Sequence, residues 1–286
     1  MITLSIKNVK YSAIIFFSLA LFFWQFASAG RGSGFLEVDF FDIGQGDAIF
    51  FEGPNGEQIL IDGGPDSTIL EKLGKEMGYF DRRVDIVVAT HPDKDHVGGL
   101  MDVLKYYNVG EVWIGVLENY NFSQSEFLRV LEKRKIPVKY IKTGDNFNFG
   151  ELKISVFNPS PKEKLKDNES SAVLKILYGG VSFLLTADIT VNVEKKLIKS
   201  EKNALDSDIL KVAHHGSKTS TSEDFLKSVS PEIAIIQVGQ GNSYGHPHQS
   251  VLERFEKFGI PFFRTDENGD IEIISDGKNY TVNSEK

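Results

Sequence analysis

The stretch VVATHPDKDHVGGL, residues 87–100, is an apolar run that ends in a cluster of potential metal ligands. Two imidazoles and two carboxylates fall within six positions, at His91, Asp93, Asp95 and His96. Carboxylates held close together without a cation would have raised pKa values and would destabilise the fold. Divalent cations reverse that effect. The pattern therefore predicts a metal site at the end of a strand that is buried on both faces.

The other histidines strengthen this prediction. All six histidines of the chain occur in three groups, HPDKDH, HHGS (His214 and His215) and GHPH (His246 and His248), and each group follows an apolar strand. Loops at strand ends are where α/β proteins place their chemistry. A further carboxylate, Asp188, ends the apolar run VSFLLTAD. Histidine and carboxylate ligands, in a chain without cysteine, indicate zinc or manganese.

Short strands alternate with helices along the chain, which predicts an α/β protein. Apolar runs at 35–43, 48–52 and 58–62 are typical of strands, and 67–77 is typical of a helix. The segment SAVLKILYGGVSFLLTAD is typical of a hairpin with a Gly179-Gly180 turn. This mixture of hairpins and strand–helix units predicts packed sheets with helices outside.

The N-terminus has the composition of an export signal. Lys7 and Lys10 precede the apolar run 11–26, and Ala27 and Ala29 form an A-x-A pattern. We expect residues 1–29 to be a signal peptide or, alternatively, a membrane anchor through residues 11–29. Either predicts an extracytoplasmic protein, secreted or anchored in the plasma membrane. After a short RGSG linker, residues 35–286 are expected to form one hydrolase domain.

The formal net charge of −8 argues against a protein that wraps nucleic acid over a large surface. The basic runs at 162–166 and 194–202 are typical of solvated faces. No protein partner is predicted from the sequence.

The segment THPDKDHVGGL resembles the metal motif of the metallo-β-lactamase superfamily, which commonly reads H-x-H-x-D-H. Here Asp93 stands at the second position. Together with FFDIGQGDAIFFEGPNGEQILIDGG, DILKVAHHGS and YGHPH, the motif is similar to the extracytoplasmic domain of ComEC-type DNA-uptake proteins over residues 35–275. The sequence has a single apolar segment, so we do not expect it to form a DNA channel by itself.

This resemblance implies a four-layer αββα sandwich with two divalent metal ions. His91, Asp93 and Asp188 would hold one ion. Asp95, His96, Asp188 and a histidine of HHGS would hold the other, with Asp188 bridging. The third histidine usual for the first ion has no counterpart, and NESS (168–171) occupies that region.

The roles of the remaining histidines stay open. His214 is slightly preferred as the ligand, which leaves His215 to contact substrate or act as a general acid. His246 and His248 would supply a leaving-group proton or bind phosphate. A rival assignment makes one of these two the ligand and gives HHGS the acid role.

The resemblance also extends to the loops around the site. Asp62 resembles a position that orders the loops under the metals. Asp42, Gln45 and Asp47 are expected to give structural support.

These expectations lead to a metal-dependent hydrolase, and we expect a phosphodiesterase or nuclease that acts on a phosphodiester such as DNA. An alternative enzyme would hydrolyse a small ester, a lactone or a phosphorylcholine-type substrate at the cell envelope. A non-enzymatic alternative is a scaffold module with a degenerate metal site.

Overall fold

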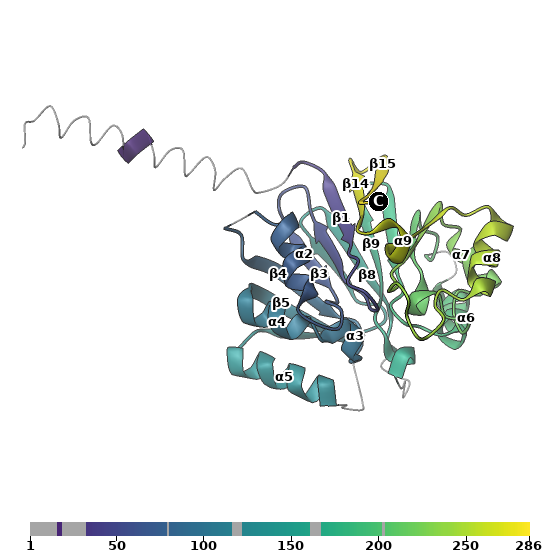
Figure 1. Ribbon diagram of the computed structural model, residues 1–286, viewed down its shortest axis with the longest axis horizontal. Helices are drawn as coiled ribbons and strands as arrows, with labels where there is room; N and C mark the ends of the chain where they lie inside the picture. Colours follow the sequence, from purple (N-terminus) through teal and green to yellow (C-terminus); the bar gives the residue numbers. More distant parts are fainter. Residues whose placement is uncertain (1–15, 19–32, 79, 116–121, 161–166, 202–203) are drawn as a thin grey trace, which may run out of the picture.

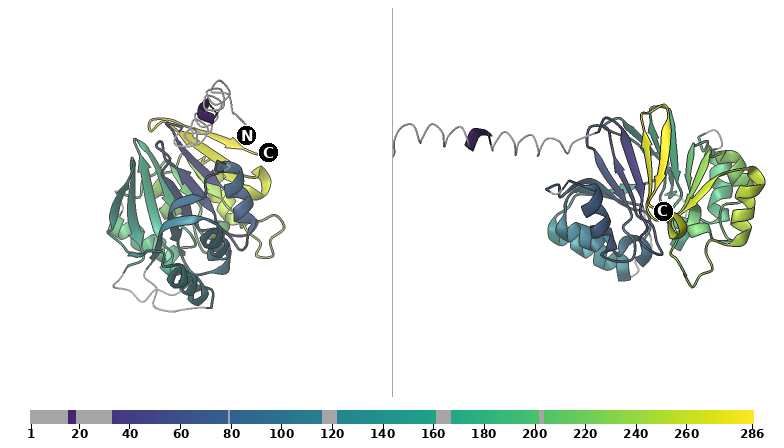
Figure 2. Two further views of the ribbon diagram at one scale, coloured as in Figure 1. Left: turned by 90° about the vertical axis from the view of Figure 1, so that its left-hand side faces the viewer. Right: turned by 45° about the horizontal axis from the view of Figure 1, so that its top comes forward.

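The computed structural model describes residues 16–18, 33–78, 80–115, 122–160, 167–201 and 204–286. From residue 33 onward, the described part folds into two stacked sheets with helices on both outer faces (Figure 1). The right-hand view of Figure 2 shows the two sheets face to face between the helical layers. This arrangement confirms the αββα sandwich expected from the sequence.

The first sheet has eight strands, and its parallel part carries the first metal motif. β3 to β6 run parallel, and the remaining neighbours are antiparallel. In spatial order the strands are β15 (Tyr280–Ser284), β14 (Ile271–Ser275), β1 (Leu36–Phe40), β2 (Ile49–Glu52), β3 (Gln58–Ile61), β4 (Arg83–Ala89), β5 (Asn108–Gly115) and β6 (Val138–Ile141).

The second sheet has seven strands, and β10 to β13 form its parallel part. The hairpin predicted around Gly179-Gly180 is present as β9 and β10, with Tyr178 opposite Val181. In spatial order the strands are β13 (Phe262–Arg264), β12 (Ile233–Ile236), β11 (Ile209–Lys211), β10 (Val181–Leu185), β9 (Val173–Tyr178), β8 (Leu152–Asn158) and β7 (Asn146–Phe149).

The helices form the two outer layers and the short turns at the sheet edge. Figure 1 shows α2, α4 and α5 beside the first sheet and α6, α7 and α8 beside the second. The helices are α2 (Thr68–Glu76), α3 (Lys94–Val97), α4 (Leu100–Tyr106), α5 (Phe122–Arg134), α6 (Val191–Glu201), α7 (Glu223–Val229), α8 (Gln249–Phe258) and α9 (Thr265–Asn268), with 3₁₀ turns η1 (Asp167–Ser170) and η2 (Ala213–Gly216).

Three apolar clusters fill the spaces between the four layers. One lies between the sheets and includes Phe51 and Phe183, whose rings meet edge to face at a centroid distance of 5.4 Å. A second joins the first sheet to α2, α4 and α5, and a third joins the second sheet to α6, α7 and α8. Burial on both faces explains why β4 is apolar without interruption from Ile86 to Ala89.

The segment interpreted as a signal peptide or anchor, residues 1–29, lies outside the described residues apart from 16–18. Among the residues that the structure describes, no helix combines the length and apolar character needed to cross a membrane.

Candidate metal centre

The three histidine groups meet where strands of both sheets end. His91 and His96 follow β4 of the first sheet, with His96 inside the short helix α3. Asp188 follows β10, and His215 lies in η2 after β11, both from the second sheet. The loops after parallel strands open at one edge of a sheet, so this topology gathers groups that are distant in sequence.

One group of four residues has the geometry of a metal site. Ligand atoms of Asp95, His96, Asp188 and His215 all lie within 4.8 Å of one another. His215 Nε2 is 3.4 Å from Asp95 Oδ2 and 3.6 Å from Asp188 Oδ2. His96 Nε2 is 3.5 Å from Asp188 Oδ1 and 3.9 Å from Asp95 Oδ2. Four ligands on bonds of about 2.1 Å in a tetrahedron stand roughly 3.4 Å apart.

A second group adjoins the first through Asp188. His91 Nε2 lies 3.7 Å from Asp93 Oδ2 and 4.0 Å from Asp188 Oδ2. Asp188 therefore faces both groups, as expected of a bridging carboxylate. The Asp93 side chain is 41% exposed, whereas that of His91 is fully buried, so this half of the centre is the more open to solvent.

The donor atoms fit a cation because nothing else in the described structure satisfies them. His91 Nε2, His96 Nε2, His215 Nε2 and Asp188 Oδ1 are buried without a hydrogen-bond partner among the described residues. Buried polar atoms are ordinarily paired, since an unpaired one costs about 1–3 kcal/mol. Their convergence on one point indicates that this is where divalent cations fit.

Outer contacts fix the orientation of two of these histidines. His96 Nδ1 lies 2.7 Å from Asp62 Oδ2, and His215 Nδ1 lies 2.9 Å from the carbonyl oxygen of Gln237. A ring nitrogen that donates to such an oxygen leaves Nε2 with its lone pair free for a metal. Asp62 also accepts hydrogen bonds from the backbone and hydroxyl of Thr90. We therefore give Asp62 an orienting role, although it also lies near His91.

Beneath the histidines lies an ion pair that the sequence analysis missed. The fully buried Lys211 donates hydrogen bonds to Asp47 and to the carbonyl oxygen of Ala187. Asp47 Oδ1 is 3.4 Å from His215 Nδ1, and Asp47 Oδ2 is 3.8 Å from His96 Nδ1. The lysine interrupts the apolar run of β11, and this was the available sequence signal.

Without metal, the charges of this centre are balanced by protons. Burial lowers the pKa of His215, but the carboxylates of Asp188, Asp47 and Asp95 together outweigh it and raise the pKa to about 9. For His96, burial is likewise outweighed by Asp188 and Asp62, so its pKa is raised. Burial and the neighbouring His96 lower the pKa of His91 to about 3. Without metal, the protons on His96 and His215 thus supply positive charge that balances the neighbouring carboxylates.

The two histidines of HHGS differ in position. Both have left-handed backbone conformations, with φ of 51° at His214 and 53° at His215. His215 is buried within the four-residue group, whereas the His214 side chain is 27% exposed and lies 3.7 Å from Asp188 Oδ2. Asn168 of the NESS segment lies 3.4 Å from the ring nitrogens of His214. The geometry therefore favours His215 as the ligand, whereas His214 was slightly preferred on sequence grounds.

The GHPH histidines take different places. His246 lies beside the centre, with its ring centroid 5.5 Å from that of His214. Burial and the neighbouring His214 lower its pKa to about 4, so it is neutral near pH 7. His248 caps α8, because its Nδ1 accepts a hydrogen bond from the backbone of Ser250. The proton-donor role of both residues stays a prediction.

The remaining loop residues support the site from outside. Gln45 Oε1 accepts a hydrogen bond from the backbone of Gly239, and Asp42 Oδ1 accepts one from the backbone of Gly44. The Gln45 contact ties the first sheet's loop to the loop after β12, whereas the Asp42 contact lies within the first sheet's loop.

The family profile of the metallo-β-lactamase superfamily matches residues 41–240, which include both groups of ligands. The chain belongs to the metallo-β-lactamase superfamily. Two competence proteins are similar to it and confirm the resemblance seen in the motifs. ComE operon protein 3 of Bacillus subtilis is 33% identical over 253 residues, which cover 82% of this chain and 32% of that protein. Competence protein ComA of Neisseria gonorrhoeae is 32% identical over 237 residues, with the same two coverages.

The chain spans about a third of the length of these relatives. A solved structure with the same fold is that of Igni18, a metallo hydrolase from Ignicoccus hospitalis. It shares 14% identity at a TM-score of 0.54, over 83% of this chain and 98% of that one. At 14% identity, the similarity to Igni18 shows a shared fold and nothing more.

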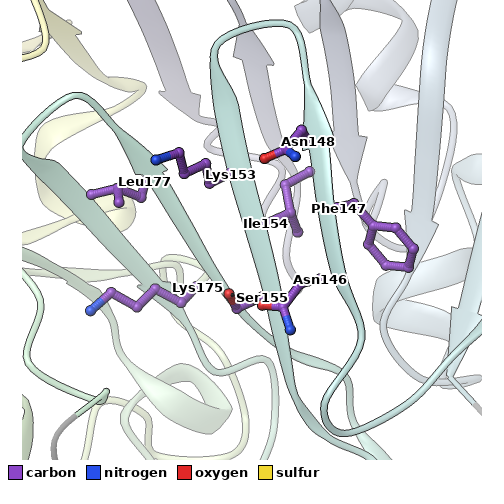
Figure 3. A pocket seen from close by; sticks show the side chains of 8 residues that line it. All are labelled: Asn146, Phe147, Asn148, Lys153, Ile154, Ser155, Lys175 and Leu177. Atoms are coloured by element: carbon purple, nitrogen blue, oxygen red, sulfur yellow. Dashed lines mark hydrogen bonds between the residues drawn. The ribbon is translucent and has the colours of Figure 1, made fainter.

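A hollow over β7, β8 and β9 of the second sheet is lined by none of the proposed metal ligands (Figure 3). Its two lysines are Lys153 and Lys175, and the amine of Lys175 donates to the carbonyl oxygens of Ala204 and Asp206. The hollow contains no histidine or carboxylate and no member of the ligand groups. Its lining residues are Asn146, Phe147, Asn148, Lys153, Ile154, Ser155, Lys175 and Leu177.

Proposed function

We propose that this chain is a metal-dependent phosphodiesterase that acts on nucleic acid. The observation that carries the proposal is the convergence of unpartnered donor atoms from His91, His96, His215 and Asp188. Divalent cations in such a centre supply a water of lowered pKa and charge that stabilises a phosphoryl group. The similarity to competence proteins supports nucleic acid as the substrate class.

The proposed cofactors are two divalent ions, zinc or manganese. His91, Asp93 and Asp188 would hold the first, and the second would be held by Asp95, His96, Asp188 and His215. The first set has fewer nitrogen ligands and more exposed carboxylate, so we assign it the weaker zinc affinity.

The neighbouring histidines act on the substrate rather than on the ions. His246 is neutral near pH 7 because its pKa is lowered to about 4. A phosphate anion beside it would raise that pKa and allow it to donate a proton to the leaving oxygen. His214, on the exposed side of Asp188, is placed to contact the same phosphate.

We also propose that the protein acts outside the cytoplasm, either secreted or held at the plasma membrane by residues 11–29. The lysines before the apolar run support this orientation. A reporter fused after Lys286 should be active only outside the cytoplasm, and a reporter active only inside would contradict the proposal.

The test of activity uses the full chain, stripped by chelator and reloaded with zinc or manganese. Substrates are single-stranded DNA, double-stranded DNA, RNA, bis-p-nitrophenyl phosphate and a small carboxylic ester. Asp188→Ala should lose both metal and hydrolysis. The matched control Asp224→Ala, whose side chain is 81% exposed, should retain both.

Three outcomes would contradict the proposal. Hydrolysis of the ester but of no phosphodiester would favour the small-ester alternative. Hydrolysis that survives the chelator would exclude a metal role. A folded protein that binds no metal would favour a scaffold.

A further inference from the structure

An exposed aromatic ring stands beside the metal centre, on the loop between β12 and α8. The Tyr244 side chain lies against His246, with ring centroids 5.9 Å apart and an interplanar angle of 23°. His246 in turn meets His214 edge to face and lies 6.4 Å from His215. A continuous row of rings therefore runs from the buried ligand His215 out to Tyr244, which is 70% exposed.

The loop holds this tyrosine in place. The side chain of Asn242 accepts hydrogen bonds from the backbone amides of Tyr244 and His246, both at 3.1 Å. The same side chain donates to the carbonyl oxygens of Gly239 and His246. Because the loop backbone is held in this way, a ligand that covers the ring has little backbone entropy left to remove.

The loop that carries Tyr244 offers a ligand no ion pair with a lysine, arginine, aspartate or glutamate side chain. Residues 237–250, QVGQGNSYGHPHQS, contain no lysine, arginine, aspartate or glutamate, and the whole chain has a formal net charge of −8. Strong polyelectrolyte binding to nucleic acid depends on many lysines and arginines that displace counterions. A nucleic-acid strand that reaches this loop must therefore gain much of its affinity there from contacts other than those with lysine and arginine side chains.

We propose that Tyr244 is a nucleobase-stacking subsite, which makes a single strand or an unpaired end the preferred nucleic acid. One face of the ring is covered by His246, and its exposed part is available to a base next to the phosphodiester at the centre. Every base has a π-face that can stack on an aromatic side chain. In a duplex these faces are already stacked, so a paired region does not fit. The inference rests on the proposed phosphodiesterase function.

The test compares base-bearing and abasic single strands of equal length and charge. Tyr244→Ala should lower the ratio of base-bearing to abasic kcat/KM about tenfold, the size of one base–aromatic stack, mainly through KM. Tyr244→Phe keeps the ring and should keep the ratio. Tyr140→Ala, which removes a 57% exposed tyrosine of β6, is the matched control.

A binding measurement makes the inference independent of turnover. Fluorescence anisotropy of labelled strands on the manganese-loaded full chain should show the same base-dependent difference, with a shallow salt dependence. The inference is overturned if Tyr244→Ala leaves either ratio unchanged, or if the wild type does not distinguish the two strands. If the wild type binds bases through Tyr244 but hydrolyses no phosphodiester, the proposed function fails while the subsite stands.

Discussion

Lys211 and Asp47 form a buried ion pair although they lie 164 positions apart in the chain. Asp47 comes from the loop before β2 in the first sheet, and Lys211 ends β11 in the second. The pair thus links the two sheets directly beneath His96 and His215. It places one fixed positive charge among carboxylates that also have to attract cations.

Replacing Lys211 with methionine should destabilise the metal-free protein by about 3–5 kcal/mol, because the buried Asp47 would lose the lysine that pairs with it directly. Added metal should recover part of this loss, since the cations then balance Asp47. Urea unfolding with chelator and with manganese measures both effects. The exposed control Lys227→Met should change stability by less than about 0.5 kcal/mol. Asp47→Asn combined with Lys211→Met should regain most of the lost stability, and a double variant as unstable as Lys211→Met would refute the pairing argument.

His214 and His215 can be separated by substitution with asparagine, which tolerates the left-handed backbone found at both positions. His215→Asn should weaken binding of the second metal at least tenfold, because it removes a ligand of the buried group. His214→Asn should keep both metals and should lower turnover. Metal content after dialysis and the hydrolysis rate of each variant show which of the two histidines is the metal ligand. The reverse pattern would make His214 the ligand.

Asp93 should set the metal preference of the first site. Its carboxylate adds charge and a hard oxygen ligand beside His91. Asp93→His should strengthen activation by zinc relative to manganese, while Asp93→Asn should weaken both because it keeps the shape and loses the charge. Calorimetric titration and phosphodiesterase rates of the three forms provide the measurement. Unchanged affinities in both variants would show that Asp93 is not a ligand.

The metal-free protein should be most stable near pH 6.5, the ordinary pKa of histidine. The pKa of His215 is raised to about 9, so its stabilisation is complete below about pH 6.5 and is lost as the pH rises through 9. The pKa of His246 is lowered to about 4, so stability falls as the pH drops from about 6.5 towards 4. Thermal melts in chelator measure both limbs.

Bound metal should remove the loss of stability that the metal-free protein shows as the pH rises from about 6.5 to 9. A cation needs neutral His215, so binding releases protons and tightens as the pH rises towards 9. His215→Asn should flatten the alkaline limb in the chelated protein. A melting temperature that rises between pH 7 and 9 in chelator would contradict the assigned pKa.

Much of this fold could be predicted from local sequence. Apolar runs predicted β4 and β10 because both faces of these strands are buried, and the glycine pair predicted the hairpin turn. The apolar run in DILKVAHHGS does not continue as a strand as far as its two histidines. β11 ends at Lys211, after which the backbone turns through η2 and presents both histidines.

The site was harder to predict in its finer detail. The histidine groups could be found because each one follows an apolar strand. The choice between His214 and His215 depends on two successive left-handed residues, which no local pattern of the sequence indicated. The pairing of Lys211 with Asp47 depends on how the two sheets stack, and sequence separation hides it.

The pairing of β1 with β14 also bears on the order in which the chain can fold as it is synthesised. Among the described residues, β1 is the first strand to emerge, but its neighbour β14 begins only at Ile271. All the proposed ligands have been synthesised by then, while the first sheet still lacks the strands that cover one edge of β1. Closing a loop of this length is entropically costly and slow. Until β14 has emerged from the ribosome, β1 presents an open edge, and that nascent intermediate is exposed to aggregation.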